Sequence, residues 1–185
     1  MTASTPVHPS TGTEGSFDAG HVVLQSGRTF RQMRLVYKTF GTLNADKSNA
    51  ILYPTSYAAQ HDDIAHMVRE GGALDPQHHF IIIANLFGNG LSSSPSNTPW
   101  PDTGSRYPDV TCYDAVHVQR RMLRELWGID RLALVYGWSM GAMQAYHWAA
   151  LFPQAVERIA VVCGAARCAP HNQVFIEGVK SALMA

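Results

Sequence analysis

The chain has 185 residues, 46% of them hydrophobic and 15% charged, with 14 basic residues balancing 14 acidic ones. This length fits one domain with a core of its own, and the hydrophobic fraction excludes extensive disorder outside the chain ends. No basic run or stripe is present, so the charge pattern of a nucleic-acid-binding protein is missing. We therefore expect a neutral or small polar substrate.

The first ten residues lack a basic segment followed by an apolar one, and no apolar stretch approaches the roughly 20 residues that a membrane helix needs. We expect a cytoplasmic protein.

The three cysteines of the chain lack metal-ligand spacing and predict buried, reduced thiols. Four histidines lie close together in sequence but lack the spacing of a helical zinc site, so we expect them on a solvated surface with no bound metal. These residues are Cys112, Cys163 and Cys168, and His61, His66, His78 and His79.

Residues 1–20, rich in Ser, Thr, Gly and Pro, predict a flexible N-terminal arm ahead of a core domain over residues 21–185. Alternating residues from Thr29 to Thr42 predict a strand early in a mixed sheet. Two short apolar runs then predict buried strands over residues 50–53 and 80–84. A helix over residues 63–70, closed by two glycines, fits between them.

A long loop rich in Gly, Ser and Pro covers residues 88–104, and loops of this length are often functional. Its Gly-x-Gly start follows a strand, but Ser93 replaces the third glycine of a dinucleotide-binding turn, which excludes nicotinamide binding there. Thr111 and Asp114 then have the spacing of a capping box, and apolar residues at helical spacing predict an amphipathic helix as far as Gly128.

The pentapeptide Gly137-Trp-Ser-Met-Gly141 joins an apolar run, residues 132–136, to a stretch of helix formers that ends before Pro153. This context predicts a nucleophile elbow, in which the turn is too tight for side chains at Gly137 and Gly141. The Ser139 hydroxyl then stands at the carboxyl edge of the sheet. The backbone N–H of Met140 lies at a helix N-terminus, where it can stabilise an oxyanion.

Another buried strand over residues 159–163 and a helix over residues 172–184 complete the pattern. Strands alternate with helices and no repeat or second domain is visible, so the fold class is α/β with a mainly parallel sheet.

A serine nucleophile needs a histidine base and an acid, which follow the serine in this architecture. After Ser139 the chain offers His147, inside the elbow helix and two turns away, and His171, which has no suitably placed acid ahead of it. The acids after Ser139 are Glu157 and Glu177. His171 is therefore the remaining candidate base among the residues after Ser139.

The whole chain resembles the homoserine O-acetyltransferase family of α/β-hydrolase-fold proteins. The resemblance lies in residues 37–50, in residues 107–114 and in the elbow segment 137–145. It implies that Ser139 is acylated, that Met140 and Tyr57 supply the two oxyanion N–H groups, and that acetyl-CoA is the acyl donor. It also implies a core domain that is incomplete at its C-terminus, with the catalytic acid and histidine beyond residue 185, because family members are roughly twice as long. Residues 1–185 alone are then expected to be poorly soluble or oligomeric and nearly inactive.

Several positions depart from the acetyltransferase pattern, including the loop over residues 87–97. Thr55-Ser56-Tyr57 stands where a His-Ala-Leu-like segment is usual, and Trp138 and Ala142 each replace a glycine. These departures indicate a divergent branch whose acceptor need not be homoserine. An esterase of the same fold is one alternative, and a binding protein on a degenerate hydrolase fold is another. A homodimer is left open.

Overall fold

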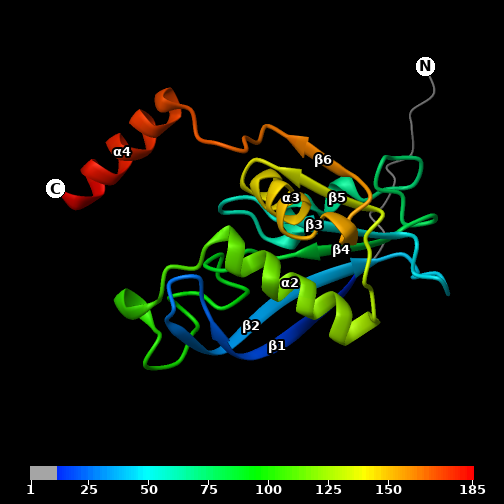
Figure 1. Ribbon diagram of the computed structural model, residues 1–185, viewed down its shortest axis with the longest axis horizontal. Helices are drawn as coiled ribbons and strands as arrows, with labels where there is room; N and C mark the ends of the chain where they lie inside the picture. Colours follow the sequence, from blue (N-terminus) through cyan, green and yellow to red (C-terminus); the bar gives the residue numbers. More distant parts are fainter. Residues whose placement is uncertain (1–11) are drawn as a thin grey trace, which may run out of the picture.

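The computed structural model describes residues 12–185 (Figure 1). It contains one six-stranded sheet of order β1-β2-β4-β3-β5-β6. The strands are β1 (Thr13–Val23), β2 (Thr29–Phe40), β3 (Ala50–Pro54), β4 (Phe80–Ala84), β5 (Leu134–Trp138) and β6 (Ile159–Val162). The helices are α1 (His61–Ile64), α2 (Cys112–Trp127), α3 (Met140–Leu151) and α4 (Pro170–Met184), with short 3₁₀ turns η1 (Ala65–Met67), η2 (Gly104–Arg106) and η3 (Pro153–Ala155).

Strands β4, β3, β5 and β6 run parallel, whereas β1 and β2 form an antiparallel hairpin at one edge of the sheet. All residues of β3 and β4 are buried, as expected for strands covered on both faces. The predicted α/β class with a mainly parallel sheet is confirmed. The parallel strands share one carboxyl edge, where the chain turns from β5 into α3.

Helices α2 and α3 cover one face of the sheet, while α1 and η1 cover the other (Figure 1). The predicted capping box of α2 is present: Asp114 N–H donates to Thr111 Oγ1, and Thr111 N–H donates to the Asp114 carboxylate. Gly128 ends the helix with φ 61°, in the left-handed conformation that favours glycine at this position.

The predicted N-terminal arm is wrong for residues 13–20, which form most of β1. Phe17 and Ala19 point into the core while their neighbours Ser16 and Asp18 are exposed. The strand is polar on its outer face and has a bulge near Gly20. Within residues 13–20, only two apolar residues therefore show the alternation of buried and exposed side chains that is typical of a strand. Residues 1–11 of the predicted arm lie outside the described residues.

Two other boundaries differ from the prediction. The helix expected over residues 63–70 is the shorter pair α1 and η1, and the chain leaves it at Met67, before the two glycines. Strand β5 begins and ends two residues later than expected, so that Gly137 and Trp138 belong to the strand. The serine therefore follows the strand directly.

The buried thiols that we predicted are not observed. Cys112 is half-buried, whereas Cys163 and Cys168 are exposed on the segment between β6 and α4. Their expected burial was inferred from cysteine chemistry alone, which does not specify where the chain leaves the core.

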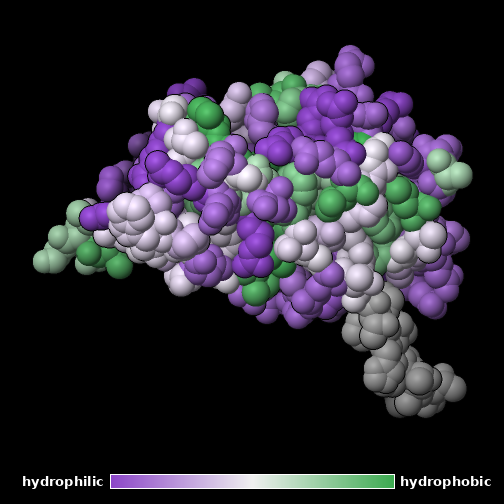
Figure 2. All heavy atoms as spheres, turned by 90° about the horizontal axis from the view of Figure 1, so that it is seen from below, coloured by the Kyte–Doolittle hydropathy of each residue, from purple (hydrophilic) through white to green (hydrophobic). Residues whose placement is uncertain are grey.

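Helix α4 projects from the body of the molecule (Figure 1), and none of its residues is buried. The projection ends in a hydrophobic tip on the left of Figure 2, and several apolar side chains of α4 are exposed. They are Val174, Phe175, Ile176, Val179, Leu183 and Met184. Among the described residues, no helix is long and apolar enough to cross a membrane.

The loop over residues 88–104 is fixed against β2. Ser93 N–H donates to the Arg34 carbonyl at 2.9 Å, Arg34 N–H donates back to Ser93 Oγ at 2.9 Å, and Val36 N–H donates to Ser92 Oγ at 3.0 Å. Both serines are buried. Serine side chains and backbone thus extend the sheet hydrogen bonding where no regular strand is present.

Asp102 anchors the end of this loop to the hairpin. Its buried carboxylate accepts hydrogen bonds from Arg28 Nη2 at 2.8 Å and from Arg31 N–H at 3.1 Å. Burial alone would raise the pKa of Asp102, but these donors outweigh it and hold the pKa below its ordinary value. The folded state therefore favours the ionised carboxylate.

Asp102→Asn is expected to lower the free energy of unfolding at neutral pH by about 1–2 kcal/mol, because it removes a charge-assisted hydrogen bond. The deficit should be complete above the ordinary aspartate pKa of about 4 and should shrink as the pH falls through the lower folded pKa. Urea unfolding at several pH values measures it. Asp109→Asn, at an exposed position, is the control. A deficit that grew below pH ~4 would contradict the sign.

Candidate active site

Ser139 lies between the end of β5 and the first residue of α3, with φ 51° and ψ −118°. A non-glycine residue in this region costs on the order of 1–3 kcal/mol and persists only where its surroundings hold it. Ser139 N–H donates to the Val162 carbonyl at 2.9 Å, and the Ser139 carbonyl accepts from Ala142 N–H at 3.0 Å. The side chain makes no capping hydrogen bond to α3, so its hydroxyl remains available for chemistry.

The two elbow glycines are required by close contacts rather than by a positive φ, which neither has. A Cβ on Gly137 would overlap the backbone of Gly141. A Cβ on Gly141 would lie 2.5 Å from the Pro54 carbonyl oxygen, at the end of β3. At Gly141 the turn is thus pressed against the neighbouring strand β3.

Gly141→Ala is expected to destabilise the protein by about 1–3 kcal/mol, because backbone atoms must move to admit the methyl group. Gly178→Ala is the matched control, since a Cβ there meets nothing within 4 Å. On the exposed helix α4 it should stabilise the fold or leave it unchanged. Thermal unfolding of both variants measures the difference. Equal melting temperatures would contradict the proposed contact.

Met140 is the first residue of α3, so its N–H has no partner within the helix. The positive end of the helix dipole adds to its preference for a negatively charged acceptor. This N–H belongs to the residue after the serine, where nucleophile elbows have one oxyanion donor.

The loop after β3 lies beside the elbow. Thr55 is fully buried, its N–H donates to the Ala84 carbonyl at 2.9 Å, and its Oγ1 accepts from Leu86 N–H at 3.0 Å. Ser56 Oγ donates to the Trp138 carbonyl at 2.7 Å, which joins this loop to the residue before Ser139. Tyr57 follows, with 82% of its side chain exposed. The structure thus brings the Tyr57 segment to the side of the elbow.

The described residues bring neither of the later histidines to the serine. His147 lies eight residues along α3 from Ser139, about 12 Å along the helix axis, and its Nδ1 is 2.9 Å from the Met143 carbonyl oxygen. His171 is on the projecting helix α4, with its ring against Phe175.

The two later acids are engaged elsewhere. Glu157 pairs with Arg131 and Arg158, and Glu177 pairs with Lys180 on α4. Within residues 12–185, no hydrogen bond joins a histidine ring to Ser139.

His61 is buried, which corrects the expectation that it lies on a solvated surface. Its Nδ1 is 2.7 Å from Asn85 Nδ2, and its Nε2 is 3.3 Å from a carboxylate oxygen of Glu14. Asn85 Oδ1 accepts from the N–H of His61 and from Asn89, so its amide nitrogen faces Nδ1 as a donor. The His61 proton therefore sits on Nε2. The partners that bury His61 are distant in sequence, so no local pattern around residue 61 indicates its burial.

Glu14, His61 and Asp62 are the only candidate metal-ligand group among residues 12–185. Lys38 Nζ lies 2.6 Å from Asp62 and 3.4 Å from Glu14. The hydrogen bond with Asp62 raises the pKa of Lys38, and the same bond lowers the pKa of Asp62. The single Lys38 ammonium already lies against both carboxylates and offsets part of their charge, and a proton faces Glu14 from His61. The geometry therefore favours an ion-pair network over a cation site.

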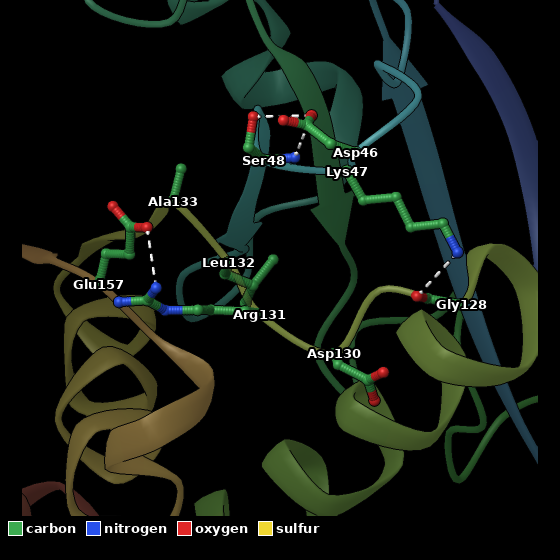
Figure 3. A pocket seen from close by; sticks show the side chains of 9 residues that line it. All are labelled: Asp46, Lys47, Ser48, Gly128, Asp130, Arg131, Leu132, Ala133 and Glu157. Carbon is green, nitrogen blue, oxygen red and sulfur yellow. Dashed lines mark hydrogen bonds and ion pairs between the residues drawn. The ribbon is translucent and has the colours of Figure 1, made fainter.

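Figure 3 shows a cavity of about 370 Å³ at the opposite edge of the sheet. Asp46, Lys47 and Ser48 line it just before β3 begins, and Leu132 and Ala133 line it just before β5. Its walls are closed by the Arg131–Glu157 ion pair and by a hydrogen bond from Lys47 Nζ to the Gly128 carbonyl. This cavity lies at the amino ends of the strands, far from Ser139 along them.

A strained serine between a parallel strand and a helix, at the carboxyl edge of such a sheet, is the arrangement of a nucleophile elbow in α/β-hydrolases. A family model described as the alpha/beta hydrolase fold matches residues 51–182. The chain belongs to this family.

Ethyl acetate hydrolase of Pseudomonas veronii is 44% identical over 159 residues, covering 85% of this chain and 46% of the relative. Homoserine O-acetyltransferase of Caulobacter vibrioides is 34% identical over 202 residues, covering 100% of this chain and 53% of the relative. The crystal structure of an acetylester hydrolase from Corynebacterium glutamicum has a TM-score of 0.88 and 40% identity, covering 91% of this chain and 49% of that one. The resemblance to homoserine O-acetyltransferases is confirmed, and these esterases are similar at higher identity. The chain spans about half the length of these relatives.

Proposed function

We propose that this chain carries the nucleophile of a serine esterase that cleaves small esters through an acyl-enzyme on Ser139. The observation that carries the proposal is the elbow, which holds Ser139 at φ 51° between β5 and α3. The 44% identity to an ethyl acetate hydrolase supports an ester substrate with a small acyl group.

In the proposed reaction, Ser139 Oγ forms a bond to the ester carbonyl carbon, and its proton passes to a general base. The carbonyl oxygen becomes an oxyanion that accepts hydrogen bonds from the N–H groups of Met140 and Tyr57. The C–O bond to the alcohol then breaks and the alcohol leaves with a proton. A water molecule then gives a proton to the base and forms a bond to the acyl carbon. The bond from that carbon to Ser139 Oγ breaks, the acid leaves, and Oγ takes back the proton. Residues 12–185 bring no base to Ser139, so the reaction requires one from the rest of the whole protein.

A second candidate is an O-acyltransferase in which an alcohol replaces water as the second nucleophile. The 34% identity to a homoserine O-acetyltransferase over the whole chain favours it. In that case acetyl-CoA is the proposed donor and a hydroxyl compound the acceptor. Both candidate reactions form the same acyl-serine. They differ only in the second nucleophile that attacks it, which is water in the esterase and an alcohol in the acyltransferase.

The whole protein that carries this chain should be given ethyl acetate in one reaction and acetyl-CoA with homoserine in another. The esterase proposal predicts acetate release from ethyl acetate without CoA, and little O-acetylhomoserine. Ser139→Ala serves as the blank for both reactions. Efficient O-acetylhomoserine formation with no ester hydrolysis would replace the proposal with the acyltransferase.

A further inference from the structure

Trp138 pairs with Val162 of β6 on one side, but on the side of β3 its carbonyl lies beyond the paired residues. Strand β3 ends at Pro54, and its register with β5 pairs only Ile51 with Leu134 and Leu52 with Val135. Trp138 is the last residue of β5, so no β3 residue pairs with it. A backbone carbonyl in this position needs another donor.

Ser56 supplies that donor. Its Oγ is 2.7 Å from the Trp138 carbonyl oxygen, across 82 residues of sequence. The hydroxyl has one proton, and this bond uses it. Ser56 Oγ is therefore not free to donate to an oxyanion and must act through its neighbours.

The residue before Ser56 is anchored to the sheet, and the residues after it form a sharp turn. Thr55 is anchored to β4 by its N–H, which donates to Ala84, and by its side chain, which accepts from Leu86. After Tyr57, Ala58 has φ 59°, and Ala59 N–H donates back to the Ser56 carbonyl at 3.1 Å. Between these two constraints, the Ser56 hydroxyl joins the turn to the elbow.

We propose that Ser56 is a positioning residue that sets the Tyr57 N–H against the Met140 N–H, so that both donors face one oxyanion. This inference rests on the proposed esterase function. Residue 56 is covalently bound to residue 57, and residue 138 precedes the nucleophile. One hydrogen bond therefore links the loop that carries the second donor to the strand that carries the serine and the first donor.

The expected effect follows from how oxyanion donors act. Removing one donor outright costs about 10²–10³-fold in kcat, and a donor must be held to within about 0.5 Å to contribute fully. Loosening the turn should cost less than removing the donor, about 10–100-fold in kcat. KM should change little, because the charge on the oxygen develops only in the transition state.

The test compares Ser56→Ala, Ser56→Thr and Ser48→Ala in the whole protein, with p-nitrophenyl acetate as substrate. We expect Ser56→Ala to lower kcat by about 10–100-fold with KM within a few-fold, and Ser56→Thr to regain most of the loss. Ser48 is the control, since its hydroxyl bonds Asp46 at the opposite edge of the sheet. Ser48→Ala should retain full activity.

Two further readouts separate positioning from a structural role. Affinity for a boronic acid, which forms a tetrahedral adduct on a serine nucleophile, should fall together with kcat/KM in Ser56→Ala, while the melting temperature changes little. Wild-type kcat in Ser56→Ala would overturn the inference. So would a loss of activity that tracks the melting temperature and that threonine does not restore. If Ser139→Ala retains activity, the proposed function itself fails, whatever Ser56 does.

Discussion

Ser139→Ala is expected to lower ester turnover by the whole protein about 10⁴–10⁶-fold, because the acyl-enzyme can no longer form. A serine-directed fluorophosphonate should label the wild-type protein once, at Ser139, and should not label this variant. The residual rate should be a trace that comes from binding and oxyanion stabilisation alone. Steady-state hydrolysis of p-nitrophenyl acetate, followed at equal protein concentration, measures the loss.

Ser105→Ala is the matched control, because Ser105 is exposed on the η2 turn and its removal should leave turnover and labelling unchanged. Unaltered turnover in Ser139→Ala would reject the nucleophile. It would also favour the remaining alternative, a binding protein that keeps the elbow geometry without using it.

A polypeptide limited to residues 1–185 is expected to turn over esters at least about 10⁴-fold more slowly than the whole protein, because no described residue acts as base for Ser139. It should also self-associate. Among residues 12–185, strand β6 has one neighbour in the sheet, and α4 exposes its apolar side chains. Size-exclusion chromatography together with the same esterase assay tests both statements.

A double substitution on α4, Phe175→Asp with Val179→Asp, is the control for the association. Both side chains are exposed, so the charges should reduce self-association without unfolding the body. A monomeric polypeptide with ordinary esterase turnover would contradict the account and would make His171 the first base to test.

The elbow could be predicted from the sequence because every feature that forms it is contiguous. All its parts lie within about twenty residues of sequence: the apolar strand, the glycines at 137 and 141 and the following helix. The tight turn between strand and helix leaves no room for side chains at the two glycine positions, which makes the pattern recognisable. The capping box of α2 is local in the same way. Its two side chains stand three residues apart.

Features that depend on distant partners could not be predicted. The burial of His61 requires Glu14 and Asn85, and the bond from Ser56 to Trp138 spans 82 residues. Strand β1 has a polar outer face, so its composition resembles that of a loop until β2 is placed beside it. Such contacts arise from the sheet order, which is not encoded in any one segment.

The exposure of α4 is a different case. Its sequence predicts a helix, and the structure has one, but burial depends on what lies against it. Helical spacing of apolar residues indicates a face suited to packing and does not identify the surface that covers it.

An acyl group on Ser139 can be trapped during turnover and located by mass spectrometry. The whole protein should be mixed with p-nitrophenyl acetate, quenched in acid within one turnover and digested. One acetyl group on the peptide that contains Ser139, absent from the Ser139→Ala variant, is the predicted result. Acetylation of another residue at the same rate, or turnover without any acetylated peptide, would contradict the account.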